Sequence, residues 1–398
     1  MSITSRARHD VVVVGARVAG AATAMLLARQ GHDVVMVDRA DLRSDTISTH
    51  QIARTGVVAL RRWGVLDEVL ASGAPALRQV TFHVDGESTT REVKDRFGVD
   101  HLVAPRRYIL DTILAEAAVR AGATLRMGVT LDGVRLNDAG RATGLHGHDR
   151  NGGLVEIDSR FVIGADGVYS RVARSVGAEV IDDRGAGGAT QYAYFAGLPW
   201  PGIEFFTADR CFAGVFPTND GEACIWVCTA DADARAARRS AGSTGAAFAA
   251  QLHRAAPALA QRLHAARRTS PVSGMLRAPN YLRRAYGPGW ALVGDAGFHR
   301  DPVSAHGISD AFRDAELLAV ALDDALRGDT DEVTALAGYQ ARRDKALREV
   351  FELTCALVTY PPVHEFVELM RQLGRAIDTE AANVAAQPVP GEQQFCPA

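Results

Sequence analysis

The sequence lacks an excess of charge of either sign. Its 398 residues include 44 basic and 47 acidic side chains, which leaves a net charge of −3. A nucleic acid or an anionic membrane surface as the main partner requires a basic balance, so we expect neither. The chain also lacks any apolar run near the roughly 18 residues of a membrane span. These absences favour a soluble protein of the cytoplasm.

Cysteine is scarce, with 5 in the whole chain. The odd number and the wide spacing argue against a disulfide framework. Cys224 and Cys228 lie four residues apart in a strand-like run, so alternation places both on one face, which allows a metal or disulfide pair. No second pair or histidine neighbours them, and we expect buried small hydrophobes and no metal site. The other cysteines are Cys211, Cys355 and Cys396.

The N-terminal region has the pattern strand, turn, helix, strand. Val11 to Val14 are β-branched, which is typical of a parallel strand that is buried on both faces. The turn Gly15-Ala-Arg17-Val-Ala-Gly20 follows, and a helical stretch then runs to Gly31. A second β-branched run ends in Asp38. This order predicts a dinucleotide-binding βαβ unit.

Each part of this unit has a physical role in holding a dinucleotide. Gly15 permits the tight turn, and Gly20 lets the helix pack closely on the strand. The first helical residues, Val18 and Ala19, offer free N–H groups and a partial positive charge to a pyrophosphate. Asp38, which Arg39 follows, can accept hydrogen bonds from ribose hydroxyls and repels a 2′-phosphate. The sequence therefore favours FAD or NAD over NADP at this site.

The middle glycine of the dinucleotide fingerprint is missing, because Arg17 stands in its place. Its Cβ occupies the position where the pyrophosphate normally approaches the backbone closely. Two alternatives remain open at this stage. The guanidinium folds back onto the phosphates as a charge-assisted fork, or it points to solvent and only weakens binding.

Two later stretches carry further motifs of the same kind. The apolar strand before Asp166-Gly167 feeds a short helix, and the strand before Gly294-Asp295 leads into a loop and the helix that begins near Gly307. Minor matches are Arg107-x-x-Leu110 and Leu336-x-x-Tyr339-x-x-Arg342. In this order the motifs resemble the para-hydroxybenzoate hydroxylase-like (group A) flavoprotein monooxygenases, to which the geranylgeranyl reductases are related.

The resemblance implies FAD as cofactor and NADH or NADPH as co-substrate. It implies that Asp295 bonds the ribitol or ribose, that Arg107 touches the cofactor, and that Asp166 lies beside the flavin and the nicotinamide. Helix N-capping is the alternative role for both acids. The resemblance also places Ser48 and Thr49 along the flavin, and the isoalloxazine against the loop formed by Pro302, Ala305, His306, Gly307 and Ile308.

The expected fold is α/β, with a Rossmann-like FAD-binding domain of the GR2 type. We expect its parts at residues 1–79, 101–180 and 280–330. Residues 80–100 and 181–279 alternate apolar and polar side chains between turns, which predicts an inserted antiparallel sheet that forms the substrate domain. Residues 331–386 read as C-terminal helices, and 387–398 as a disordered tail.

Several residues are candidates for chemistry or for substrate binding. His50 could act as a base or as a substrate contact, and the alternative is a hydrogen-bonded loop histidine. His306 and Pro302 are candidates in the flavin loop, with His299 a weaker one. Five aromatic residues of the expected sheet could line a pocket for an aromatic substrate, although most strand aromatics belong to a core: Tyr192, Tyr194, Phe206, Phe216 and Trp226.

The leading functional expectation is an FAD-dependent monooxygenase, in which a C4a-hydroperoxyflavin oxidises an aromatic or polyketide-like small molecule. The runner-up is a C=C reductase, because Phe212-Ala-Gly214-Val-Phe216-Pro217 faintly resembles the reductases' Y-x-W-x-F-P. A flavin halogenase is less favoured, since W-x-W-x-I-P is absent and no lysine occurs in the first 90 residues. A non-catalytic flavin binder rests only on Arg17 and on Ser304, which replaces a loop glycine. A monomer and a homodimer are both compatible with the sequence.

Overall fold

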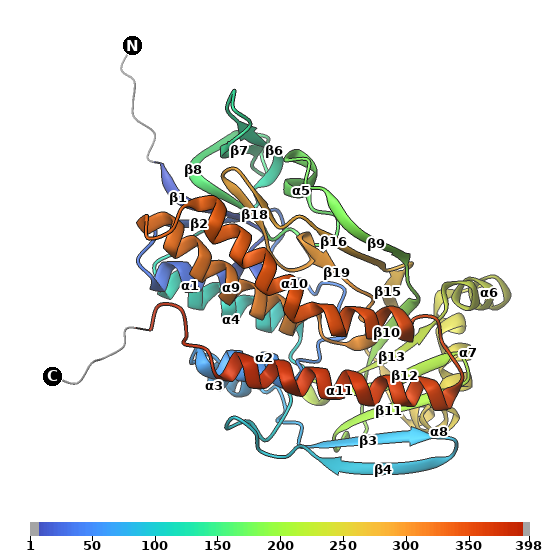
Figure 1. Cartoon of the computed structure of the whole chain (residues 1–398). Helices are drawn as coiled ribbons and strands as arrows, with labels where there is room; N and C mark the ends of the chain where they lie inside the picture. The colour runs from blue at the N-terminus through green and yellow to red at the C-terminus, as the bar shows by residue number, and fades with distance from the viewer. Residues whose placement is uncertain (1–7, 393–398) are drawn as a thin grey trace.

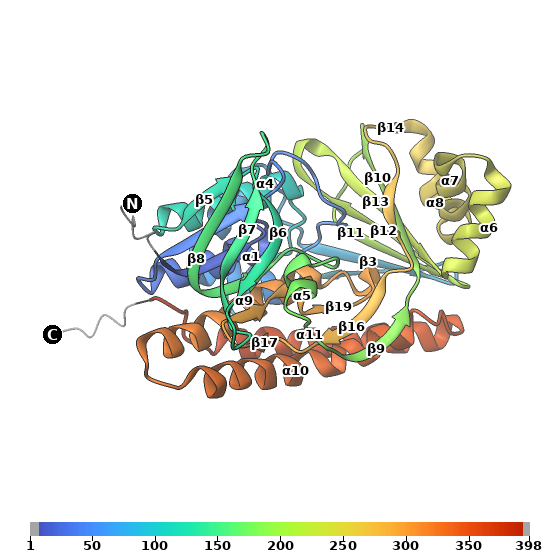
Figure 2. The same ribbon diagram turned by 90° about the horizontal axis from the view of Figure 1, so that it is seen from above.

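The computed structural model describes residues 8–392 (Figure 1). Two large sheets lie side by side, and the long helices α10 (Glu332–Leu357) and α11 (Val363–Ala385) run beneath both of them (Figure 2). Among the described residues no helix is both long enough and apolar enough to cross a membrane. The expected α/β fold, with an inserted sheet and a C-terminal helical segment, is confirmed.

The first sheet is the dinucleotide-binding one. Its parallel core has the order β18 (Trp290–Leu292), β8 (Leu154–Gly164), β1 (His9–Val14), β2 (Val34–Asp38) and β5 (Thr124–Met127). The antiparallel strands β6 (Thr130–Leu136), β7 (Ala142–His148) and β17 (Tyr286–Gly287) extend it. Because the chain turns to opposite sides of β1, a crevice opens at the carboxyl ends of the strands.

Helix α1 (Val18–Arg29) lies on one face of this sheet between α4 (Arg107–Arg120) and α9 (Gly307–Arg327). Its alanine-rich surface is almost wholly buried, since small side chains let all three helices approach closely. A Cβ on Gly20 would lie only 1.8 Å from the Gly15 carbonyl oxygen, so the predicted need for glycine there is confirmed. Helices α2 (Arg54–Arg62), α3 (Leu66–Ala71) and α5 (Arg171–Ser175) complete this part.

The second sheet is the inserted one. Its strands have the order β14 (Arg267–Arg268), β10 (Ala189–Ala196), β13 (Ala223–Thr229), β12 (Cys211–Pro217), β11 (Ile203–Ala208), β3 (Gln79–Val84) and β4 (Glu87–Glu92), and β15 (Ser273–Leu276) pairs with β10. It is antiparallel except where β3 pairs in parallel with β11. The strand alternation could not reveal this pair, which joins the two inserts into one sheet.

Both faces of the second sheet are covered. Helices α6 (Asp231–Ala241), α7 (Thr244–Ala255) and α8 (Pro257–Arg262) lie at the end of this sheet that is far from the first sheet (Figure 2). α7 and α8 cover one face of the sheet, and α11 covers the other face with Phe366 and Leu373. Cys224 and Cys228 are buried free thiols of one apolar cluster, and burial holds the pKa of both above the ordinary thiol value. Cys396 lies outside the described residues.

A short third sheet and the chain end complete the fold. β9 (Val180–Ala186), β16 (Pro279–Arg283) and β19 (Phe298–His299) form the sheet. The tail expected at 387–398 differs from a disordered segment over its described part, because Val389 is buried in the main core and Arg62 donates to the Gln387 carbonyl at 2.7 Å. Residues 393–398 lie outside the described residues.

Candidate active site

A cavity of about 750 Å³ opens where the carboxyl ends of β1, β2, β8 and β18 face the second sheet. This volume lies within the roughly 300–1,000 Å³ of typical small-molecule and cofactor sites. The position is also the one where open α/β sheets bind ligands. Most of the predicted site residues line it: Gly15, Arg17, Val18, Ala19, Asp38, Arg39, Ser48, Thr49, His50, Arg107, Asp166, Tyr192, Asp295, Pro302, Ala305, His306, Gly307 and Ile308.

The turn after β1 forms one end of the cavity. Gly15 adopts a φ of +104°, and a Cβ there would lie 2.3 Å from the Ala165 carbonyl oxygen. The N-terminus of α1 has no side-chain cap, so its free N–H groups are available to an anion. Asp38 accepts hydrogen bonds from the backbone N–H groups of Ala16 and Ala40, both at 2.9 Å. The acid therefore shapes the turn beside which a ribose would lie.

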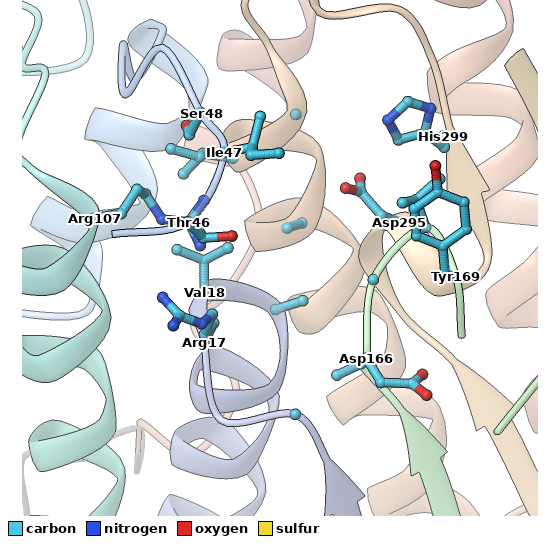
Figure 3. Close-up of a pocket in the computed structure, with 18 of the residues that line it drawn as sticks. Arg17, Val18, Thr46, Ile47, Ser48, Arg107, Asp166, Tyr169, Asp295 and His299 are labelled. Atoms are coloured by element: carbon cyan, nitrogen blue, oxygen red, sulfur yellow. The ribbon is translucent and has the colours of Figure 1, made fainter. Parts of the chain in front are cut away.

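Arg17 neither points freely to solvent nor extends alone into the cavity. Its Nη1 donates to Asp111 Oδ2 at 2.7 Å and to the Ser44 carbonyl at 3.1 Å. Asp111 is fully buried and also accepts from Arg107 Nε at 3.0 Å. The carboxylate of Asp111 thus joins the guanidinium groups of Arg17 and Arg107. Figure 3 shows both arginines beside the start of α1. This pair supplies positive charge next to the free N–H groups of the helix.

Asp166 has the capping role that was the alternative to a ligand contact. Its carboxylate accepts from Ser170 Oγ at 2.5 Å and from the backbone N–H of Arg171 at 2.6 Å. Burial raises the pKa of this carboxyl, and the hydrogen bonds oppose that rise. Because Asp166 also lines the cavity, the capping bonds orient it there.

Asp295 differs from Asp166. Among the described residues no group donates a hydrogen bond to its carboxylate, which faces the cavity near His299 (Figure 3). The side chain is open to the cavity although protein surrounds it. This burial raises its carboxyl pKa, and the charges of His299 and Arg107 oppose the rise. A carboxylate that is exposed to the cavity and has no partner within the protein can accept hydrogen bonds from a bound ligand.

The loop before α9 forms the other end of the cavity. Asp301 Oδ1 accepts from the Val303 N–H at 2.9 Å and caps a 3₁₀ turn over Pro302–Ser304. Ala305 then takes a left-handed conformation with φ +49°, where a glycine would be unstrained. The chain leaves this turn into α9, whose N-terminus faces the cavity. A helix N-terminus stabilises negative charge on a ligand.

Comparison with known proteins decides which dinucleotide this cavity serves. Residues 8–354 match the protein family described as "FAD binding domain". The chain belongs to this family. It is an FAD-dependent oxidoreductase, as the motifs predicted, with the flavin fold of the monooxygenases it resembles.

The names of proteins that are similar to this chain cover different chemistries. The chain is 26% identical over 388 residues to digeranylgeranylglycerophospholipid reductase 1 of Methanopyrus kandleri, covering 93% of this chain and 95% of the reductase. PqsL, a probable FAD-dependent monooxygenase of Pseudomonas aeruginosa, superposes with a TM-score of 0.77 at 23% identity, over 92% of this chain and all of PqsL. The myxobacterial chondrochloren halogenase CndH gives 0.79 at 21%, over 95% and 90%.

The cavity fits FAD on structural grounds. A side chain at Gly15 would collide with the Ala165 carbonyl oxygen, so the turn after β1 stays close to the segment that follows β8 and both line the cavity. Ile47 and Tyr169 are 55% and 75% exposed, although large apolar groups are usually covered, and both line the cavity (Figure 3). Asp295, which has no hydrogen-bond donor among the described residues, lies near Tyr169 in the same cavity (Figure 3). A flat ring system with a polyol chain would cover the apolar groups and bond the acid.

Four of the five predicted substrate aromatics do not line the cavity. Phe206 packs on the far face of the second sheet with Phe248 of α7. Phe216 and Trp226 are buried in the core between this sheet and α11, and Tyr194 is covered by His50 and Arg106. These four residues belong to the core, which was the alternative to a substrate contact. Tyr192 alone of the five lines the cavity, and its hydroxyl accepts from the Ser48 N–H at 3.3 Å.

Sequence reasoning missed several residues of the site. Asp111 could have been found, because its i, i+4 spacing from Arg107 on a helix is that of an ion pair. Ile47 and Tyr169 carry no such pattern. Gly20, predicted as a cofactor contact, lies behind the cavity wall and serves close helix–strand packing. His306 is among the residues that line the cavity, but its side chain has no exposed surface.

Proposed function

We propose that this protein is a monooxygenase that uses NADH or NADPH and O2 to oxidise an aromatic or polyketide-like small molecule. The observation that carries the proposal is His50, a buried imidazole without a hydrogen-bond partner at the cavity wall next to the second sheet. Bound FAD would supply the redox chemistry between the nicotinamide, O2 and the substrate. The protein itself would position the substrate and would accept a hydrogen bond from its acidic group.

The burial and the backbone conformation of His50 are both energetically unfavourable. It is only 1% exposed, and neither ring nitrogen has a partner among the described residues. Its backbone φ is +68°, a left-handed conformation that an L residue adopts at a cost of about 1–3 kcal/mol. An unsatisfied buried polar group costs a further 1–3 kcal/mol or so. Such costs at a cavity wall support a functional role.

The surroundings of His50 suit an aromatic ligand with an acidic proton. The imidazole stacks on Tyr194 with centroids 5.5 Å apart and meets Tyr192 edge-on at 6.3 Å. Burial holds the pKa of His50 well below its ordinary value, and the positive charges of Arg107 and Arg106 add to this effect. A neutral imidazole has one ring nitrogen that can accept a hydrogen bond from a phenol or an amino-substituted ring. As the ring is oxidised its O–H or N–H becomes more acidic, and such an acceptor would stabilise the developing positive charge.

The other ends of the cavity would hold the cofactor. Asp295 would accept from the flavin side chain, and Arg17 with Arg107 would face the pyrophosphate beside α1. Asp38 disfavours a 2′-phosphate on the adenosine held there. The nicotinamide would bind without a dinucleotide fold of its own, since the described residues form a single βαβ fingerprint.

The two alternative chemistries find less support at this cavity. The residues that resemble the reductase motif lie elsewhere: Phe212 is in the core against Phe366, and Trp226 fills the space beside Gly214. A lysine at the cavity would favour a halogenase. The two lysines of the sequence, Lys94 and Lys345, do not line it. The 26% identity to a lipid reductase keeps C=C reduction as the second candidate.

The test is a substrate screen with isotopically labelled O2. Purified holoenzyme is incubated with NADH or NADPH and a panel of phenols, aminoaryl ketones and polyketide aromatics. We expect substrate-stimulated nicotinamide oxidation and one labelled oxygen in the product. Reduction of a substrate C=C bond without O2, or halide-dependent halogenation, would replace the proposal with the corresponding alternative.

A further inference from the structure

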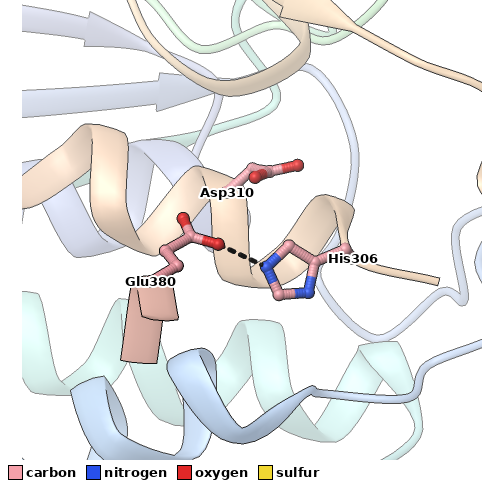
Figure 4. A group of neighbouring side chains, drawn as sticks. All are labelled: His306, Asp310 and Glu380. Atoms are coloured by element: carbon pink, nitrogen blue, oxygen red, sulfur yellow. Dashed lines mark hydrogen bonds and ion pairs between the residues drawn. The ribbon is translucent and has the colours of Figure 1, made fainter. Parts of the chain in front are cut away.

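Glu380 reaches the flavin loop from a helix that lies beyond the matched family region. The match ends at residue 354, whereas Glu380 is on α11. Its Oε2 accepts from His306 Nε2 at 2.8 Å (Figure 4). The Glu380 side chain is 6% exposed and that of His306 has no exposed surface. A segment outside the family's common part therefore contacts the residue that precedes α9.

The pair belongs to a buried network of charges. Arg313 Nη1 donates to Glu380 Oε1 at 2.6 Å and to Asp310 Oδ1 at 2.9 Å, and Arg300 Nη2 donates to Asp310 Oδ2 at 2.6 Å. His306, Asp310 and Glu380 lie close enough to share a metal ion. Two guanidinium groups already supply the positive charge there, so the cluster suits an ion-pair network rather than a metal site.

The network fixes how His306 is held. Burial alone would raise the pKa of Glu380, but Arg313 and His306 outweigh it and keep this carboxyl below its ordinary value. Glu380 is therefore an acceptor, and the hydrogen of the shared bond resides on His306 Nε2. His306 is the N-cap residue of α9, and residues 304–308 line the cavity. The bond to Glu380 therefore ties the start of α9 to α11.

The same turn of α11 is anchored on its other side. Asp378 accepts from Arg96 at 2.6 Å and lies 3.6 Å from Arg54, and Thr55 Oγ1 donates to the Ile377 carbonyl at 3.3 Å. Arg54 and Thr55 begin α2, directly after the segment that holds His50. The turn of α11 that carries Glu380 is thus tied to the start of α2 as well as to His306.

We propose that Glu380 is a positioning residue of the flavin site, which acts through His306 to hold the N-terminus of α9 against bound FAD. Reduced flavin carries more negative charge than oxidised flavin, and a fixed helix N-terminus favours the more negative form. The inference depends on FAD binding and not on the oxygenase reaction, so it can stand or fall independently of that reaction.

The test is Glu380→Gln, which keeps the shape of the side chain and removes its charge. The matched control is Glu368→Gln, an exposed acid of the same helix that contacts only neighbouring side chains on α11. We measure the FAD dissociation constant of the apoprotein and the flavin midpoint potential. In E380Q the preference for reduced over oxidised FAD should fall about tenfold, which lowers a two-electron potential by about 30 mV. The control should retain the wild-type potential.

A double-mutant comparison separates positioning from mere stability. His306→Phe removes the same bond and should lower the potential by a similar amount, and E380Q should add little in that background. If E380Q fails to fold, His306→Phe carries the test on its own. A lower melting temperature with an unchanged potential in the folded variants would overturn the proposal. So would equal, additive effects of the two substitutions.

Discussion

The two ends of the cavity treat their polar side chains in opposite ways. At the end beside α1, Asp38 and Arg17 have hydrogen-bond partners within the protein. At the end beside the second sheet, neither ring nitrogen of His50 has a partner, and no group among the described residues donates to the carboxylate of Asp295. A polar side chain with partners inside the protein is fixed in the frame of the site, whereas one at the cavity without such partners is free to bind a ligand.

The two buried histidines repeat this contrast within a single residue type. His306 donates to Glu380, while His50 lacks any partner and has a strained backbone. Both were candidates for chemistry, His50 from the segment after the second strand and His306 from the flavin loop. Their partners now divide them: His306 belongs to the support and His50 to the ligand-facing wall. The predictions below either break this division or sharpen it.

The largest effect is expected at His50. His50→Leu removes the hydrogen-bond acceptor but retains an apolar side chain, and we expect turnover to fall about 10²–10⁴-fold with FAD content unchanged. Steady-state kinetics on the substrate found by the screen, together with the flavin-to-protein ratio, checks this. Tyr194→Phe, which keeps the stacked ring, is the control and should retain most activity. Equal activity of His50→Leu and wild type would place His50 in the frame.

We expect the charge of Asp295 to favour FAD binding and to lower the stability of the apoprotein. Its pKa is raised in the folded protein, so folding favours its protonated form and stability falls as pH rises above the ordinary value near 4. Asp295→Asn should thus raise the melting temperature of the apoprotein at pH 7 by roughly 2 °C. The same change should weaken FAD binding by more than about tenfold, because a charge-assisted acceptor is lost.

Thermal melts of the apoprotein and of the FAD-loaded protein at pH 5 and pH 8 check both effects of Asp295→Asn. The gain from the substitution should be smaller at the lower pH, where the wild-type carboxyl is closer to its protonated state. A substitution that destabilised the apoprotein at pH 8 would show that Asp295 already has a structural partner.

Arg17 is expected to have a smaller effect on the cofactor. Arg17→Ala removes one guanidinium beside α1 and leaves Asp111 paired with Arg107 alone. FAD binding should weaken about tenfold, as for the loss of a bond worth roughly 1.4 kcal/mol. Titration of apoprotein with FAD measures this, and Arg17→Lys should recover part of the affinity. Unchanged affinity would mean that Arg17 serves only to hold Asp111.

The parts of the site that the sequence revealed are those set by local chemistry. The β-branched run before Gly15 and the acid that ends the next strand determine a turn and its cofactor edge within thirty residues or so. Glu380 could not be found in this way, since it meets His306 across a fold that brings α11 beneath α9. The parallel pair β3–β11 was hidden for the same reason, because alternation reports faces and not neighbours.

The aromatic residues of the second sheet show a further limit. Alternation predicts two faces for each strand, and the usual inference is that only one face is buried. Here α7 and α8 bury one face and α11 buries the other, so both carry aromatics. Pattern alone could not tell which aromatic residue reaches the cavity. Tyr192 does so because β10 lies at the side of the sheet next to Ser48.

The smallest effect on function is expected at Phe216, which was predicted to contact the substrate but lies in the core of the protein. Phe216 has no exposed surface and packs against Trp226 and Phe205. Phe216→Leu should lower the free energy of unfolding by about 1 kcal/mol and leave KM and kcat unchanged. Tyr192→Phe keeps the ring but loses the hydroxyl at the cavity, so it should alter KM with little loss of stability. If Phe216→Leu changed KM as much as Tyr192→Phe, the substrate would extend beyond the cavity into the core of the second sheet.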